Sequence, residues 1–176
     1  MSEQPGPSPR FDFKPVARPA QAAAYLAPDL PPYFVPRAEL GAIKRLLVGR
    51  PAVALAPAPL HGPAGSGKTS LAAALAHDAD ILHAFPDGVL WASLPEGGSV
   101  QHAQAVWAGA LGEDLAARPD TASRSAALRT LLRDRRALLI VDGVSSVEQV
   151  KALNVGGPSC ARVLTTGSGD GVLLAF

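Results

Sequence analysis

The stretch LHGPAGSGKTSLAAALA, residues 60–76, decides the fold class of this 176-residue chain. Residues 62–69 match the pattern G-x-x-x-x-G-K-[S/T] of a phosphate-binding loop at every fixed position. The glycines let successive backbone N–H groups turn toward phosphates, and a helix that begins at Lys68 adds free N–H groups and a favourable dipole. We expect Lys68 to contact the β- and γ-phosphates and the Thr69 hydroxyl to coordinate Mg²⁺. The residues predicted to bind nucleotide here are Gly62, Pro63, Ala64, Gly65, Ser66, Gly67, Lys68, Thr69 and Ser70.

Strand-like and helix-like segments alternate around this loop, which argues against a chance match in a glycine-rich chain. The apolar runs predict strands at 52–62, 88–94, 136–143 and 161–167. The helical pattern predicts helices at 37–47, 68–77, 99–111, 121–134 and 145–154, with Thr121 and either Ser145 or Ser146 as N-caps. Strands separated by helices indicate a parallel sheet. The predicted fold class is therefore α/β, a P-loop NTPase three-layer sandwich.

The first 32 residues differ in composition from the rest of the chain. They are rich in Pro, Ala and polar residues, and the sequence APDLPP at 27–32 cannot continue a helix. We predict a tail or linker over 1–32, with one short helix at 21–26, and a nucleotide-binding domain over 33–176.

Composition argues against several classes of partner. A net charge of +1 provides no strong field for nucleic acid or an anionic membrane. No stretch approaches the roughly 20 unbroken apolar residues of a spanning helix, and the N-terminus has no apolar signal core. The single cysteine, Cys160, cannot form an internal disulfide. We therefore predict a cytoplasmic protein with no membrane or nucleic-acid partner.

A second group of candidate residues follows two of the predicted strands. Asp142 ends the buried run ALLIVD, at the sheet edge where ligands bind in such folds. It fits the Walker B role, which holds Mg²⁺ through water, and the alternative is an ordinary turn aspartate. Thr165 and Thr166 end the next strand, and Thr166 is the predicted sensor of the γ-phosphate. The alternative for the threonines is that they fill a strand as β-branched residues.

Two prolines conflict with the predicted strand before the loop. Pro57 and Pro59 cannot donate hydrogen bonds to a sheet, and a central strand rarely contains two prolines. The two prolines are two residues apart, so the backbone N–H groups that both lack would have pointed toward the same neighbouring strand. The strand is therefore expected to pair well on one side only.

The chain resembles the NB-ARC group of STAND ATPases over roughly residues 33–176. The matching stretches are YFVPRAEL, GPAGSGKTSLA, FPDGVLWASL, ALLIVDGV and VGGPSCARVLTTG. The resemblance implies a sheet of the additional-strand type, in which the P-loop strand lies beside the strand that follows the Walker B strand. It also implies that Val35 and Arg37 contact the adenine, with the arginine donating hydrogen bonds. It implies a cofactor of ADP or ATP with Mg²⁺, and a switch in which ATP binding leads to self-association.

Three departures from the family pattern decide what we expect of the nucleotide. Gly143 stands where the family commonly has a second Walker B acid, and Gly167 stands where it commonly has the sensor arginine. The given sequence ends at Phe176, before the fifth strand, helical domain and winged-helix domain that the resemblance implies. Without the fifth strand, the P-loop strand would be an edge, where prolines cost less. A positioned base contributes roughly 10² to 10⁴ in rate and an arginine on the γ-phosphate roughly 10³ to 10⁵. We therefore expect a nucleotide switch with very slow or absent hydrolysis. The alternatives are an active ATPase that takes its acid from elsewhere or from a neighbouring subunit, and a P-loop kinase of small molecules.

Overall fold

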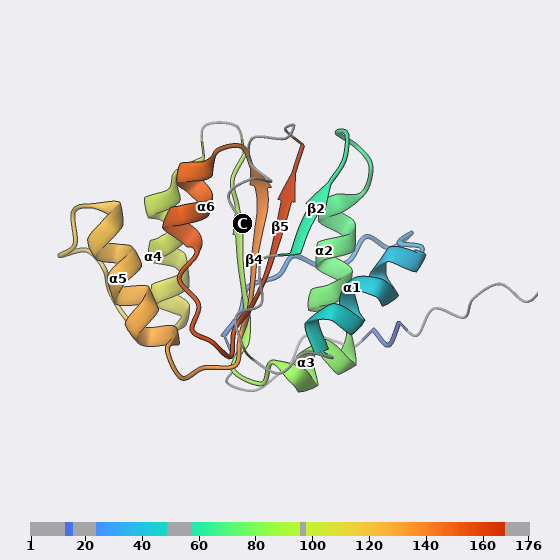
Figure 1. The fold of residues 1–176 in the computed structure, drawn as a ribbon, viewed down its shortest axis with the longest axis horizontal. Helices are drawn as coiled ribbons and strands as arrows, with labels where there is room; N and C mark the ends of the chain where they lie inside the picture. The colour runs from blue at the N-terminus through green and yellow to red at the C-terminus, as the bar shows by residue number, and fades with distance from the viewer. Residues whose placement is uncertain (1–12, 16–23, 49–57, 96–97, 168–176) are drawn as a thin grey trace, which may run out of the picture.

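The computed structural model describes residues 13–15, 24–48, 58–95 and 98–167, and these form a three-layer α/β sandwich (Figure 1). A sheet of five parallel strands lies in the middle, in the order β1-β3-β4-β5-β2. The strands are β1 Ala24–Tyr25, β2 Ala58–His61, β3 Gly88–Ser93, β4 Leu138–Val144 and β5 Ala161–Thr166. This confirms the predicted α/β fold with a parallel sheet.

Helices lie on both faces of the sheet (Figure 1). On one face lie α1 Ala38–Val48, α2 Lys68–Ala76 and α3 Ala79–Ala84, and on the other lie α4 Val100–Ala110, α5 Thr121–Leu132 and α6 Val147–Leu153. Side chains alternate along the strands, so Leu138 and Ile140 of β4 pack in the first core, whereas Leu139 and Val141 pack in the second. The two cores explain why the strands read as continuous apolar runs.

The P-loop strand β2 lies at one end of the sheet. It pairs only with β5, through the register Pro59↔Leu164 and Leu60↔Thr165, within the described residues. The strand that follows the Walker B strand is therefore its neighbour, as the resemblance implies. Pro59 is accommodated because an edge strand needs donors on one side only. The prediction for Pro57 lies outside the described residues.

The N-terminal region contributes the strand at the opposite end of the sheet. Ala24 and Tyr25 pair with Gly88 and Val89 of β3, inside the segment predicted to be a tail or linker. The helix predicted at 21–26 is wrong over 24–26, the part that the structure describes, because Tyr25 is buried and its hydroxyl donates a 3.2 Å hydrogen bond to the carbonyl of Ala76. Tertiary pairing outweighs the helical preference of this alanine-rich segment, because tertiary contacts routinely override intrinsic propensity.

Two local predictions need correction. The N-cap of α5 is Asp120 rather than Thr121, since the Asp120 carboxylate accepts a 2.8 Å hydrogen bond from the N–H of Ser123. Helix α3 was not predicted, because its six residues are too few for a periodic apolar pattern. The expected cap of α6 is confirmed at Ser146, which forms a reciprocal capping box with Gln149.

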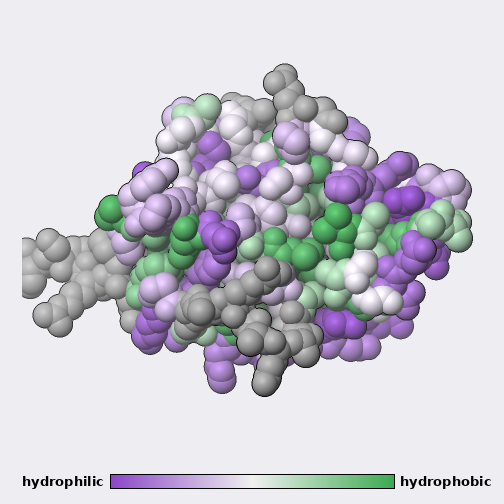
Figure 2. Space-filling model, turned by 180° about the vertical axis from the view of Figure 1, so that it is seen from behind, coloured by the Kyte–Doolittle hydropathy of each residue, from purple (hydrophilic) through white to green (hydrophobic). Residues whose placement is uncertain are grey.

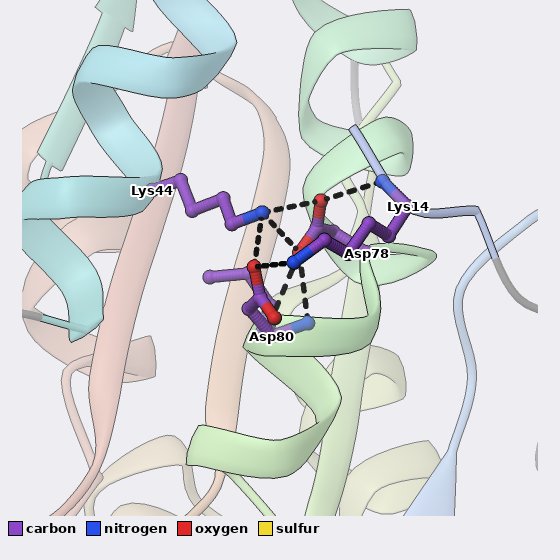
Figure 3. A network of polar contacts seen from close by, with 5 residues as sticks. Lys14, Lys44, Asp78 and Asp80 are labelled. Atoms are coloured by element: carbon purple, nitrogen blue, oxygen red, sulfur yellow. Dashed lines mark hydrogen bonds and ion pairs between the residues drawn. The ribbon is translucent and has the colours of Figure 1, made fainter. Parts of the chain in front are cut away.

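A buried ion pair fastens α1 to the start of α3 (Figure 3). The Lys44 ammonium lies 3.0 Å from Oδ1 of Asp78 and 2.6 Å from Oδ2 of Asp80. Asp78 is fully buried and caps α3 by accepting from the N–H groups of Asp80 and Ile81. The backbone N–H of Lys14 donates to the same carboxylate. These contacts hold three separate parts of the chain together beneath the P-loop helix.

The surface of the molecule mixes hydrophilic and hydrophobic residues. Seen from behind, small apolar areas lie among polar ones (Figure 2). Among the described residues, no helix is long and apolar enough to cross a membrane.

Candidate functional site

The loop between β2 and α2 has the backbone geometry of a phosphate cradle. Gly65 and Gly67 have φ angles of 76° and 85°, a left-handed conformation that favours glycine. Gly67 is the N-cap of α2 and offers no side chain to cap its first-turn N–H groups. These donors, together with the positive end of the helix dipole, suit an anionic ligand. The sequence-predicted segment from Gly62 to Ser70 therefore forms one continuous loop and helix start.

Lys68 lies over this loop rather than in the core. Its Nζ donates hydrogen bonds of 2.7 and 2.8 Å to the carbonyls of Gly62 and Pro63. The Ser66 hydroxyl lies 3.5 Å from the same nitrogen. A half-buried ammonium group at the mouth of the loop is the cation that such a cradle needs for phosphates.

Thr69 and Asp142 meet although they come from different elements. Thr69 lies in the first turn of α2 and Asp142 lies near the end of β4, yet the Thr69 hydroxyl donates a 2.8 Å hydrogen bond to Oδ1 of Asp142. A hydroxyl and a carboxylate are the hard oxygen groups that Mg²⁺ prefers alongside nucleotide phosphates. The donor set of this structure thus fits the predicted metal, with Thr69 and Asp142 as the residues that would hold it.

The two threonines at the end of β5 occupy different faces of the sheet. The Thr165 hydroxyl donates a 2.5 Å hydrogen bond to Oδ1 of Asp142. Thr166 follows on the strand, where it pairs with Val144 and His61 in register, and strand alternation places its side chain on the opposite face. The structure therefore places Thr165 beside Asp142, while the sensor role of Thr166 stays a prediction. The sequence alone does not distinguish the two threonines, because the register between β4 and β5 decides which of them faces Asp142.

Arg37 lines two pockets. One, of about 240 Å³, is lined by Pro31, Tyr33, Phe34, Val35, Arg37, Gly67, Ser70 and Leu71. The other, of about 470 Å³, lies between α1, β2 and the P-loop. Val35 and Arg37 thus share a pocket with the start of α2, next to the predicted phosphate site. Tyr33 and Phe34 were not predicted, although two aromatic residues directly before Val35 could have indicated an apolar wall.

Arg37 also makes a direct contact with the P-loop. Its Nη1 donates a 2.7 Å hydrogen bond to the carbonyl of Ser66. A Cβ atom at Gly67 would lie 3.1 Å from Nη2 of Arg37, so glycine at this position gives the guanidinium room to approach. The arginine therefore links the pocket that contains Val35 to the phosphate loop.

The two glycines that depart from the family pattern have different surroundings. Gly143 has a φ of 84°, and a Cβ atom there would lie 2.7 Å from the carbonyl oxygen of Leu94. Gly167 is exposed, has no atom within 4 Å of such a Cβ, and has an ordinary backbone conformation. The structure thus demands glycine at 143 but not at 167.

Comparison with known proteins gives a consistent result. The family model of the NB-ARC domain matches residues 39–170. The regulatory protein AfsR of Streptomyces griseus is 35% identical over 166 residues, which cover 87% of this chain and 16% of that protein. AfsR of Streptomyces coelicolor is 38% identical over 111 residues, which cover 60% of this chain and 11% of that protein. The chain therefore spans only a small part of the length of these relatives.

Proposed function

Because the chain belongs to the NB-ARC domain family, a group of nucleotide-binding STAND modules, we propose that it is an adenine-nucleotide switch of a signalling protein. In this proposal it binds ADP or ATP with Mg²⁺, and the bound nucleotide controls self-association. The observation that carries the proposal is the meeting of Thr69 and Asp142 at 2.8 Å beside a complete P-loop.

Each part of the site has a distinct role in the proposed complex. The N–H groups at the start of α2 and the Lys68 ammonium bind the phosphates, since both present positive charge to the same loop mouth. The Thr69 hydroxyl directly, and Asp142 through water, would hold Mg²⁺, which when bound would supply positive charge beside the phosphates. Val35 and Arg37 line the pocket that would hold the adenine.

The proposed switch hydrolyses ATP very slowly. Gly143 and Gly167 provide neither a carboxylate for the attacking water nor a cation for the γ-phosphate. The crowded carbonyl of Leu94 supports this view, because it leaves no space for a side chain at position 143. The name of the relatives, regulatory protein AfsR, supports a role in regulation. A cytoplasmic location, where adenine nucleotides are available, is part of the proposal.

The direct test is calorimetric titration of the chain with ADP, ATP and GDP in the presence of Mg²⁺. We expect saturable binding of ADP and ATP, with GDP clearly weaker. Absence of binding by any of the three would contradict the nucleotide switch. Equal affinity for ADP and GDP would contradict only the assignment of the adenine pocket. Light scattering of the chain with each nucleotide then tests the proposed self-association.

A further inference from the structure

The hydroxyl of Thr165 bridges the backbone N–H of Gly143 and the carboxylate of Asp142. Its oxygen accepts a 2.9 Å hydrogen bond from the N–H of Gly143, and its proton is donated to Oδ1 of Asp142 at 2.5 Å. The direction of both bonds is fixed, since an amide N–H can only donate and a carboxylate can only accept. Thr165 is only 1% exposed, so water cannot readily replace its hydroxyl. The carboxylate of Asp142 is therefore held from the β5 side.

The backbone around Asp142 is shaped to make this contact. The pairing of β4 with β5 shifts register between Val141 and Val144, which marks an irregularity of the β-bulge kind at Asp142 and Gly143. Such a bulge redirects the side chain that it carries. The carbonyl of Asp142 accepts a 2.7 Å hydrogen bond from the N–H of Leu94, which ties the same bulge to the residue directly after β3. Both neighbouring strands thus fix the bulge.

The backbone conformation of this bulge requires glycine at position 143. Its φ of 84° is rare for other residues, and the Leu94 carbonyl leaves no space for a Cβ atom. With this conformation, the Gly143 N–H reaches Thr165 while the Asp142 carboxylate reaches Thr69 on the first turn of α2. Gly143, which stands in place of the second Walker B acid, therefore has a structural role in shaping this bulge.

We propose that Thr165 is a positioning residue for magnesium binding, which together with the N–H of Gly143 holds the Asp142 carboxylate toward Thr69. This inference rests on the proposed function and adds a residue that acts through Asp142 rather than on the ligand. Partners that orient metal ligands typically contribute about 10- to 100-fold in metal affinity. The expected signature is a loss of the gain in ATP affinity that Mg²⁺ provides, with no loss in Mg²⁺-free binding.

The test measures ATP affinity by calorimetry in Mg²⁺ and in EDTA for the wild-type chain and for Thr165→Val, which removes the hydroxyl at nearly constant volume. We expect the ratio of the two affinities to fall about 10-fold or more in Thr165→Val, with the affinity in EDTA unchanged. Thr165→Ser keeps the hydroxyl and should restore the ratio. Thr130→Val, which removes a hydroxyl that bonds within α5, is the matched control and should behave as wild type.

A second variant and a parallel control make each outcome decisive. Gly143→Ala should reduce the same ratio, because it displaces the N–H that Thr165 accepts. Thr165→Ala replaces Thr165→Val if thermal unfolding shows that the valine variant does not fold. A wild-type ratio in a folded variant without the hydroxyl would overturn the positioning role while leaving nucleotide binding intact. Wild-type affinity in Lys68→Ala would instead show that the proposed function itself is wrong, and the positioning role with it.

Discussion

The hydroxyl of Thr69 donates a 2.8 Å hydrogen bond to Oδ1 of Asp142, a residue 73 positions later in the chain. The contact joins the first turn of the P-loop helix to the end of a central strand. It forms because α2 begins beside the carboxyl end of β4, where side chains from neighbouring parallel elements converge. The relationship brings together the two residues that the sequence predicts as magnesium ligands.

Asp142→Asn tests the metal role of this pair. Asparagine removes one negative charge beside the metal and accepts hydrogen bonds from metal-bound water less strongly than a carboxylate, so we expect the gain in ATP affinity from Mg²⁺ to fall about 10-fold or more. Binding in EDTA should be unchanged or slightly tighter, because a negative charge near the phosphates is lost. Calorimetry in both buffers gives the measurement, with the exposed Asp134→Asn as control. Full Mg²⁺ dependence in Asp142→Asn would argue against a metal role for Asp142.

Turnover of ATP should be very slow in the unmodified chain. We expect phosphate release well below about one per minute, a rough value that follows from the missing base and the missing γ-phosphate cation. Multiple turnovers that disappear in Lys68→Ala would show that the chain is an ATPase after all. The Lys68 variant excludes a contaminating enzyme as the source of phosphate.

The two glycine positions should respond differently to substitution. Gly167→Arg should fold and bind as wild type, because its Cβ meets no other atom within 4 Å. Gly143→Asp should lower the free energy of unfolding by about 1–3 kcal/mol, the usual cost of a strained backbone conformation. Urea unfolding of both variants makes the comparison. Equal stability of the two variants would contradict the steric account of Gly143.

Arg37→Ala tests the pocket for the base. A site that hydrogen-bonds one base rejects another because its polar groups are left unpaired. We expect Arg37→Ala to weaken ADP binding more than GDP binding, and so to narrow the difference between the two. The exposed Arg45→Ala on α1 is the control for loss of a positive charge nearby. An unchanged preference for ADP would remove Arg37 from the adenine contacts.

The ion pairs of Lys44 with the buried Asp78 and the partly exposed Asp80 predict how stability depends on pH (Figure 3). The hydrogen bond from Lys44 holds the pKa of Asp80 below its ordinary value, and outweighs desolvation. Burial, the largest influence on Lys44, lowers its pKa, but the hydrogen bonds and charges of Asp80 and Asp78 together raise it above its ordinary value. The stability from Asp80 is therefore present above about pH 4 and lost as the pH falls further. The stability from Lys44 is present below about pH 10 and lost as the pH rises further.

Lys44→Met should remove much of this dependence. The variant leaves the buried Asp78 without its cation, so we expect a loss of about 3 kcal/mol near neutral pH. Between pH 6 and pH 3, the variant should lose less further stability than wild type, because Asp80 then titrates near its ordinary pKa. Urea unfolding at the two pH values measures both effects, with the exposed Lys151→Met as control. Identical acid sensitivity in wild type and Lys44→Met would contradict the ion-pair account.

The P-loop and the main elements could be predicted because their signals are local. The fixed spacing of Gly62, Gly67 and Lys68 specifies one backbone geometry, and the apolar run before Asp142 specifies a buried strand. The place of β2 at the end of the described sheet could also be predicted, since Pro59 has no N–H to donate to a neighbouring strand. These features depend on neighbouring residues in the chain and not on distant contacts.

The remaining features depend on contacts that the sequence does not display. Tyr25 joins the sheet because of its partners on β3 and its hydrogen bond to Ala76. Lys44 and Asp78 look like ordinary surface charges until the fold buries them together. Thr165 rather than Thr166 reaches Asp142 because of strand parity and the irregularity at Gly143. In each case, the decisive partner lies in another element.

The nucleotide affinity of Lys68→Ala tests the central claim, that this loop is a phosphate cradle. The Lys68 side chain lies over the loop and contacts the Gly62 and Pro63 carbonyls, so its removal should leave the fold and the unfolding temperature nearly unchanged. Calorimetry with ADP and ATP in Mg²⁺ should then show an affinity lower by about 10-fold or more, as expected for losing a charge-assisted contact. The exposed Lys151→Ala should bind as wild type. Equal affinity of Lys68→Ala and wild type for both nucleotides would contradict the account.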